Sequence, residues 1–175
     1  MKIAVIGNAA GGKTRLSREL ANFYQITPTH VDSIQFGPGM TIRPHADTRA
    51  ALEVVASQDN WIIDGYGPLD IIEKRFSQAD QIILIDLPIA RHLFWFGKRQ
   101  LFSLWSPRRE LPPGCKELSY RHSAKVIKSM WSMHREMRPE LIKILARPQY
   151  NPKVTIIKSV RDLNRFRRQS LARET

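Results

Sequence analysis

The sequence predicts an α/β protein in which helices cover both faces of a five-stranded parallel sheet, a three-layer α/β/α fold. Two observations favour this class. Short apolar runs rich in β-branched residues, such as KIAVI at residues 2–6, are typical of strands buried on both faces. Segments with helical spacing of apolar residues separate these runs, so strands and helices alternate along the chain. A length of 175 residues suits one domain, covering residues 1–175.

Five strands are expected, each bounded by a turn signal or by a helical segment. In chain order they are residues 2–6, 29–32, 60–65, 80–88 and 153–158. The fourth, DQIILIDLP, is the strongest of the five and ends at Pro88. After the second strand, residues 33–45 contain two glycines and two prolines, which predicts a loop.

Helices are expected in the intervals between the strands. The first, over residues 13–24, has Leu16, Leu20 and Phe23 on one face. The others run from Asp47 or Thr48 to about Gln58, over a short segment before residue 80, and over residues 89–104, 117–147 and 159–171. Pro139 should kink the longest helix or start a new one there.

The net charge of +12 is concentrated in the second half of the chain. Residues 1–90 hold eight Lys/Arg and ten Asp/Glu, residues 91–150 hold thirteen and four, and residues 151–175 hold seven and two. Such a field attracts polyanions, which include nucleoside triphosphates, nucleic acids and acidic lipids. The single cysteine, Cys115, rules out an internal disulfide, and no apolar run approaches the roughly 18 residues that span a bilayer. We therefore expect a soluble, cytoplasmic protein without a membrane partner.

Residues 7–14, GNAAGGKT, follow the first strand and match the phosphate-cradling pattern G-x-x-x-x-G-K-[ST] of a P-loop. We call them the glycine loop. Its glycines allow backbone N–H groups to converge on phosphate oxygens, and the helix that follows adds its positive dipole end. Lys13 is expected to neutralise the β- and γ-phosphates of ATP, and the Thr14 hydroxyl to hold Mg²⁺. The expected cofactor-binding residues are Gly7, Asn8, Ala9, Ala10, Gly11, Gly12, Lys13, Thr14 and Arg15.

Two strands end in an aspartate that can serve the metal. Asp64 is favoured because it stands in an Asp-Gly pair, as at the end of the strand beside the P-loop strand in nucleotide-monophosphate kinases. Asp86 is the alternative, with a structural role such as capping the next helix. Asp32, at the end of the second strand, is expected to contact the phosphoryl acceptor or the metal, or else to cap a helix or turn. Arg75, on the short helix after Asp64, is placed at the acceptor, with a surface charge as its alternative.

A basic, proline-rich break between two helices predicts a small helical lid over about residues 98–116. It carries Arg99, Arg108 and Arg109, whose planar guanidinium groups match phosphate oxygens and are expected to stabilise the transferring phosphoryl group. Three more arginines follow the lid: Arg121, Arg135 and Arg138. The alternative is that these basic residues lie on solvated helix faces.

Several motifs together make the chain resemble a known family. They are GNAAGGKT, HVDS before a Pro-Gly loop, WIIDGYG, ADQIILIDLP, and GCKELSYR…MWSMHREMRPEL. Over nearly its whole length the sequence resembles the adenylate-kinase-like P-loop proteins known as DNA topology modulation proteins. The resemblance implies a nucleotide kinase-like P-loop NTPase fold, ATP as donor and an undefined small acceptor. Trp95 stands where related kinases often carry an arginine against the adenine, and stacking of its ring on the base is one interpretation.

Two functional hypotheses follow. The first is an ATP-binding, Mg²⁺-dependent phosphotransferase of the nucleoside or nucleotide kinase type, with Lys13, Asp64 and the lid arginines as catalytic residues. The second is an ATP-binding, nucleic-acid-associated regulator with weak or no kinase activity, which contacts phosphate backbones through the tail RDLNRFRRQSLARET. A membrane-surface role for the helix over 159–171 is less favoured, because its apolar side chains are expected to pack on the sheet.

Overall fold

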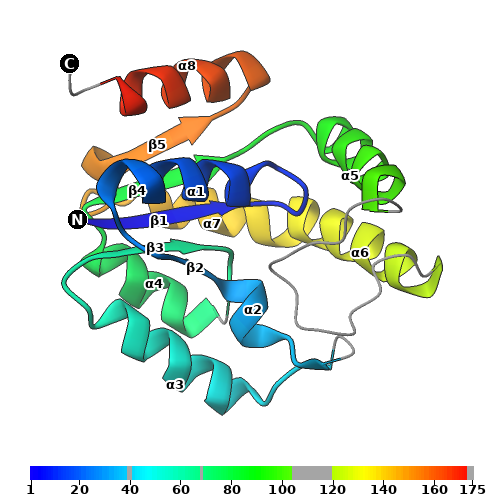
Figure 1. Ribbon diagram of the computed structural model, residues 1–175, viewed down its shortest axis with the longest axis horizontal. Helices are drawn as coiled ribbons and strands as arrows, with labels where there is room; N and C mark the ends of the chain where they lie inside the picture. The colour runs from blue at the N-terminus through cyan, green and yellow to red at the C-terminus, as the bar shows by residue number, and fades with distance from the viewer. Residues whose placement is uncertain (39–40, 68, 104–119, 173–175) are drawn as a thin grey trace.

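The computed structural model describes residues 1–38, 41–67, 69–103 and 120–172, and Figure 1 shows their arrangement. The described chain forms a parallel sheet of five strands in the order β2-β3-β1-β4-β5. The strands are β1 (Lys2–Gly7), β2 (Pro28–His30), β3 (Trp61–Asp64), β4 (Gln81–Ile85) and β5 (Val154–Ile157). The expectation of an α/β fold with a five-stranded parallel sheet is therefore confirmed.

Helices occupy every connection between successive strands, which is the arrangement that parallel pairing requires. The α-helices are α1 (Lys13–Tyr24), α2 (Val31–Gln35), α3 (His45–Ala56), α4 (Leu69–Gln78), α5 (Ile89–Ser103), α6 (Tyr120–Ser132), α7 (Arg138–Leu145) and α8 (Val160–Leu171). A π-helical turn, η2 (Met133–Met137), joins α6 to α7, and a 3-10 turn, η3 (Asn151–Lys153), precedes β5.

Apolar side chains of β1 alternate between the two faces of the sheet. Ala4 and Ile6 belong to one buried cluster, and Ile3 and Val5 belong to another. The first cluster includes apolar residues of α3, α4 and α7, and the second includes those of α1 and α8. Figure 1 shows α1 and α8 on one side of the sheet, with α3 and α4 on the other. Helices thus cover both faces, in agreement with a three-layer α/β/α fold.

The segment after β2 differs from the expected loop over residues 33–45. The strand ends at His30 and a short helix follows at once, so Asp32 lies in the first turn of α2 and not at a strand end. The positive end of the helix dipole favours a carboxylate there. The Asp32 side chain is exposed, and its carbonyl accepts the N–H of Phe36 at 3.0 Å, which closes the helix.

The long helix expected over residues 117–147 is found as α6, η2 and α7 in succession from Tyr120 onward. In η2 the Arg138 N–H bonds to the Met133 carbonyl, five residues back, so the turn is wider than an α-helical turn. Pro139, which has no N–H to donate, lies in the first turn of α7. Of the two outcomes expected at Pro139, a kink or a new helix start, the structure has a helix that starts beside it, at Arg138.

Part of the expected lid lies outside the described residues. Of residues 98–116, only 98–103 are described, as the last turns of α5, and Arg108 and Arg109 fall in the remainder. Across the four described ranges, no helix combines the length and apolar character needed to cross a membrane.

Candidate functional site at the carboxyl ends of β1, β3 and β4

The candidate site lies where the connections of the sheet change direction. From β1 the chain passes to β2 and β3 on one side of it, and then to β4 and β5 on the other. The crevice outside such a switch point is the usual ligand site of open parallel sheets. Gly7, at the end of β1, pairs with Ile85 at the end of β4, and the glycine loop begins at this point.

The backbone of the glycine loop requires unusual conformations. Gly7, Ala10 and Gly12 all have positive φ angles, of 146°, 54° and 86°. At Gly7 a Cβ atom would lie 2.5 Å from the Ile85 carbonyl oxygen, so only glycine fits beside β4. Helix α1 starts after Gly12 without a side-chain cap and without an acidic residue in its first turn. Its first N–H groups are therefore suited to an anion.

Two polar side chains tie the glycine loop together. Asn8 is largely buried, accepts the Ala9 N–H at its Oδ1 (2.8 Å) and donates from Nδ2 to the Met130 carbonyl (2.9 Å). Asn8 thereby links the loop to α6. The Lys13 ammonium donates to the Asn8 carbonyl at 2.9 Å. Its positive charge therefore lies beside the glycine loop, where the sequence pattern predicts a phosphate.

Asp64 lies at the carboxyl end of β3, where it contacts His30 of the neighbouring strand. The two residues are register partners, and His30 Nδ1 lies 2.8 Å from Asp64 Oδ2. Their side chains are 15% and 7% exposed, so the pair is shielded from water. An ionised carboxylate only accepts hydrogen bonds, and the imidazole therefore donates from Nδ1 to it. The contact with His30 uses Oδ2 of Asp64, and Oδ1 takes no part in it.

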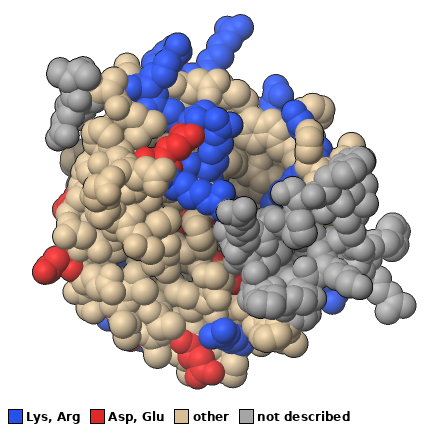
Figure 2. Space-filling view, in the orientation of Figure 1, with Lys and Arg blue, Asp and Glu red and all other residues tan. Residues whose placement is uncertain are grey.

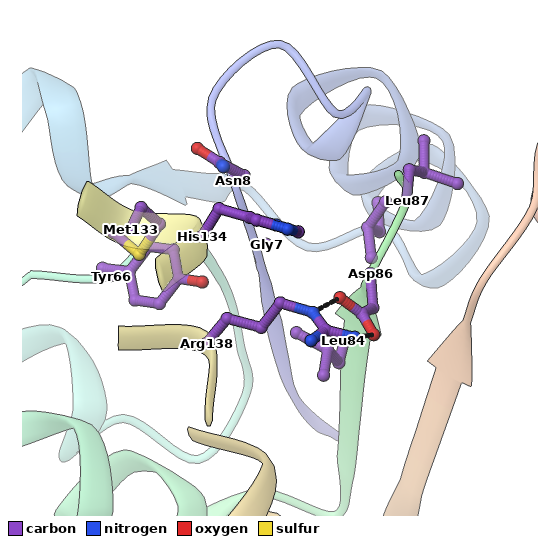
Figure 3. Close-up of a pocket in the computed structure, with 10 residues that line it drawn as sticks. Gly7, Asn8, Tyr66, Leu84, Asp86, Leu87, Met133, His134 and Arg138 are labelled. Carbon is purple, nitrogen blue, oxygen red and sulfur yellow. Dashed lines mark hydrogen bonds and ion pairs between the residues drawn. The ribbon is translucent and has the colours of Figure 1, made fainter. Parts of the chain in front are cut away.

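A small pocket lies beside the glycine loop, and Figure 3 shows the side chains around it. They come from the ends of β1 and β4, from the turn after β3, and from the helix that contains η2. The lining residues are Gly7, Asn8, Tyr66, Leu84, Ile85, Asp86, Leu87, Met133, His134 and Arg138. The π-helical turn thus contributes directly to the pocket wall, a setting in which such turns often occur.

Arg138 and Asp86 form a two-pronged ion pair in this pocket. Arg138 Nε lies 2.5 Å from Asp86 Oδ1, and Nη2 lies 2.8 Å from Oδ2. The bond to Asp86 raises the pKa of Arg138. Burial and the nearby Asp86 charge raise the pKa of the Tyr66 hydroxyl, which therefore stays protonated. The structural role found for Asp86 is this pair, in place of the expected helix cap.

Arg75 is buried, which excludes the alternative of a surface charge. Its side chain has no exposed area, and Nη2 donates to the carbonyls of Gly65 (3.0 Å) and Tyr66. Nε and Nη1 have no hydrogen-bond partner among the described residues. Burial lowers the pKa of Arg75 to about 10, against the opposing effect of the Asp64 carboxylate, so the guanidinium remains charged at neutral pH. Arg75 therefore holds the backbone after Asp64.

Three further residues named in the sequence analysis lie on α1 and α5. Arg15 pairs with Glu19 on the exposed side of α1 at 3.1 Å. Arg99 places its guanidinium 5.2 Å from the centre of the Phe96 ring. Trp95 lies near the glycine loop, because a Cβ at Gly12 would be 3.7 Å from its ring.

Sequence reasoning missed the partners of the two aspartates and one buried histidine, His92. His30 stands in the THVD motif, but its contact with Asp64 follows from strand register and has no local signal. In the sequence Arg138 is one arginine of a basic cluster, with nothing that points to Asp86. His92 lies in a helix with no motif around it, yet it is 1% exposed and bonds to the glycine loop.

Comparisons with known proteins leave the family of the chain open. No protein-family model matches the sequence, and a search of curated proteins gives no significant match.

Proposed function

We propose that the protein is a P-loop NTPase of the nucleoside or nucleotide kinase type, an ATP-binding, Mg²⁺-dependent phosphotransferase acting on a small acceptor. One observation carries the proposal. The glycine loop combines positive-φ backbone at Gly7 and Gly12, an uncapped helix start and the Lys13 ammonium, all at the switch point of a parallel sheet. This combination suits a polyphosphate, and the +12 net charge favours anionic ligands.

ATP bound here would supply the transferable phosphoryl group. The loop N–H groups would bind its phosphate oxygens, and Lys13 would exchange its contact with the Asn8 carbonyl for the phosphates. Thr14, in the first turn of α1, would hold Mg²⁺ through its hydroxyl. Asp64 is the better second metal residue, because Asp86 uses both of its oxygens for Arg138 whereas Asp64 contacts His30 through Oδ2 alone.

The acceptor side would be organised by residues around β2 and β3. Asp32 is exposed on α2 and accessible to an acceptor. Arg75 would act indirectly, because it is buried and holds the carbonyls of Gly65 and Tyr66. Arg99 would supply positive charge from α5, together with Arg108 and Arg109 beyond the described residues.

A phosphoryl-transfer assay tests the proposal. Labelled ATP and Mg²⁺ are incubated with panels of nucleosides, nucleotides and small hydroxyl compounds, and phosphorylated products are separated. Lys13→Ala should lower the rate by about a hundredfold or more, since it removes a charge that stabilises the transferring group. Lys143→Ala, which changes an exposed lysine on α7, should leave the rate unchanged. Absence of ATP binding and of transfer to every acceptor would disprove the proposal.

The choice between the two aspartates has its own test. Asp64→Asn should raise the Mg²⁺ concentration needed for half-maximal rate, because it weakens a metal-binding oxygen. Asp86→Asn should act mainly on stability through Arg138. A larger Mg²⁺ effect at Asp86 would reverse the assignment.

A second candidate, a nucleic-acid-associated regulator, is favoured by one surface. Arg161, Arg165 and Arg168 are exposed and spaced three or four residues apart, so they lie on one face of α8. Together with the exposed Lys158, which precedes the helix, we call them the basic stripe. Figure 2 shows basic side chains projecting at the top of the view, where α8 lies in Figure 1. Such a stripe suits contact with a phosphate backbone.

Gel-shift measurements at two salt concentrations separate the candidates. Changing the four stripe residues to Gln should abolish salt-sensitive DNA binding if the regulator proposal holds. The pair Lys125→Gln and Lys128→Gln, at exposed positions of α6, is the control. ATP-dependent transfer without DNA binding would reject the regulator.

A further inference from the structure

His92 belongs to α5 and contacts the glycine loop at Ala9, which lies 83 positions earlier in the sequence. Its Nδ1 is 2.9 Å from the Ala9 carbonyl oxygen. A carbonyl only accepts, so the Nδ1 atom carries the proton and donates it. The same edge of the ring approaches Gly11 so closely that a Cβ there would lie 2.8 Å from His92 Cε1 and 3.3 Å from Nδ1. His92 therefore contacts the loop on both sides of Ala10.

Ala10 is the loop residue that needs such support. Its φ of 54° lies in the left-handed region, which disfavours residues with a Cβ. Gly12, the other left-handed residue of the loop's second half, meets no such restriction. A conformation of this kind persists only where surrounding contacts enforce it. The bond to Ala9 and the packing on Gly11 are contacts that hold both neighbours of Ala10.

The charge state of His92 suits this role. Burial lowers its pKa, the Ala9 carbonyl opposes that effect, and the charges of Lys13 and His134 lower the pKa further. The imidazole is thus neutral at physiological pH and holds the loop without adding a second charge beside Lys13.

We propose that His92 is a positioning residue that braces the glycine loop in its ligand-binding shape. The inference rests on the proposed ATP site, because the braced peptide is part of the phosphate cradle. A loop already held in this shape would not have to be ordered when the ligand binds. Without the donor at position 92, the Ala9 carbonyl loses its partner and Ala10 can leave the left-handed region. The binding-competent loop is then only one of several conformers, and apparent affinity falls.

A matched pair of substitutions tests the brace. Asn places an amide N–H close to the position of the histidine Nδ1, whereas Leu has nearly the same shape as Asn and no donor. Dissociation constants for Mg-ATP are measured by titration calorimetry well below each unfolding temperature. His92→Leu should weaken binding by about tenfold, and His92→Asn by less than about threefold. Leu145→Ala opens a cavity in the buried cluster that includes residues of α3, α4 and α7. It should lower stability without changing the affinity for Mg-ATP.

The role of Ala10 gives a second readout that packing alone would not change. Ala10→Gly removes the penalty of the left-handed conformation, so adding it to His92→Leu should restore part of the lost affinity. If His92→Leu does not fold, a tenfold loss in His92→Asn would overturn the brace, since that variant keeps the donor. Normal binding by His92→Leu would also overturn it while leaving the ATP site intact. Failure of the unmodified protein to bind Mg-ATP would overturn both.

Discussion

Arg138 holds both carboxylate oxygens of Asp86, with Nε 2.5 Å from Oδ1 and Nη2 2.8 Å from Oδ2. The pair joins the end of β4 to the helix that follows the π-helical turn, 52 positions later in the chain. The wide turn at Met133 precedes Arg138 directly, and Met133 and His134 line the same pocket. The pair therefore links two parts of the pocket wall, the end of β4 and the helix after η2.

Removing the arginine of this pair should destabilise the protein. Arg138→Met leaves the Asp86 side chain, only 7% exposed, with an unpaired charge. Since Arg138 itself is 39% exposed and partly screened, we expect the free energy of unfolding to fall by about 1–3 kcal/mol. Urea denaturation measures the change. Arg147→Met breaks a surface pair with Glu73, and its loss should stay below about 1 kcal/mol. Equal losses in the two variants would contradict this interpretation.

Three glycine substitutions should change the free energy of unfolding by amounts that differ in sign and size. Gly7→Ala places a Cβ 2.5 Å from the Ile85 carbonyl, and a loss above about 3 kcal/mol is expected because both strands would have to shift. Gly12→Ala meets side chains only at 3.7 Å, so its loss should reflect the φ of 86°, about 1–2 kcal/mol. Gly97→Ala, in α5 with nothing within 4 Å, should gain about 0.5–1 kcal/mol. Thermal denaturation gives the order, and any other order would refute the geometry.

Arg75 and its neighbour Lys74 offer a matched comparison on α4. Arg75→Met removes the donor to the Gly65 and Tyr66 carbonyls and the positive charge near Asp64, so we expect a loss of about 2–4 kcal/mol. Lys74→Met breaks a contact with Glu53 at a half-exposed position, and its loss of stability should be much smaller than that of Arg75→Met. Chemical denaturation of both variants measures the difference. A neutral Arg75→Met would show that the buried guanidinium is not needed to hold this turn.

The lowered pKa of His92 predicts a pH-dependent stability. The unfolded chain takes up a proton near the ordinary value of 6.5, whereas the folded protein takes it up only at lower pH. The unfolded state therefore binds more protons in this window, and stability falls as pH falls below about 6.5, by at most about 1.4 kcal/mol per pH unit. His92→Asn removes this titration, so the stability difference between wild type and variant should shrink as pH falls. Above about pH 7.5 that difference should be constant. A difference independent of pH from 5 to 8 would refute the assignment.

Much of the fold follows from local patterns in the chain. The apolar run KIAVI and the strong run ending at Pro88 predict buried strands, and all five expected strands are present. Two strand ends differ in detail: the second strand ends at His30, with Asp32 in a helix, and the fourth ends at Ile85 and not at Pro88. A four-residue segment such as THVD has no periodicity that separates a strand end from a first helical turn. The boundary is seen only in the pairing with β3, where His30 and Asp64 are the last register partners.

The sequence by itself determined the α/β class, the position of the glycine loop at a strand-to-helix junction, and an interruption of the long helix near Pro139, because each depends on residues a few positions apart. Only the tertiary structure decided the partners of the polar groups: His30 for Asp64, Arg138 for Asp86, and His92 for Ala9. These contacts join residues 34, 52 and 83 positions apart. Strand register and helix packing bring them together, and no local pattern specifies which buried polar groups will satisfy one another.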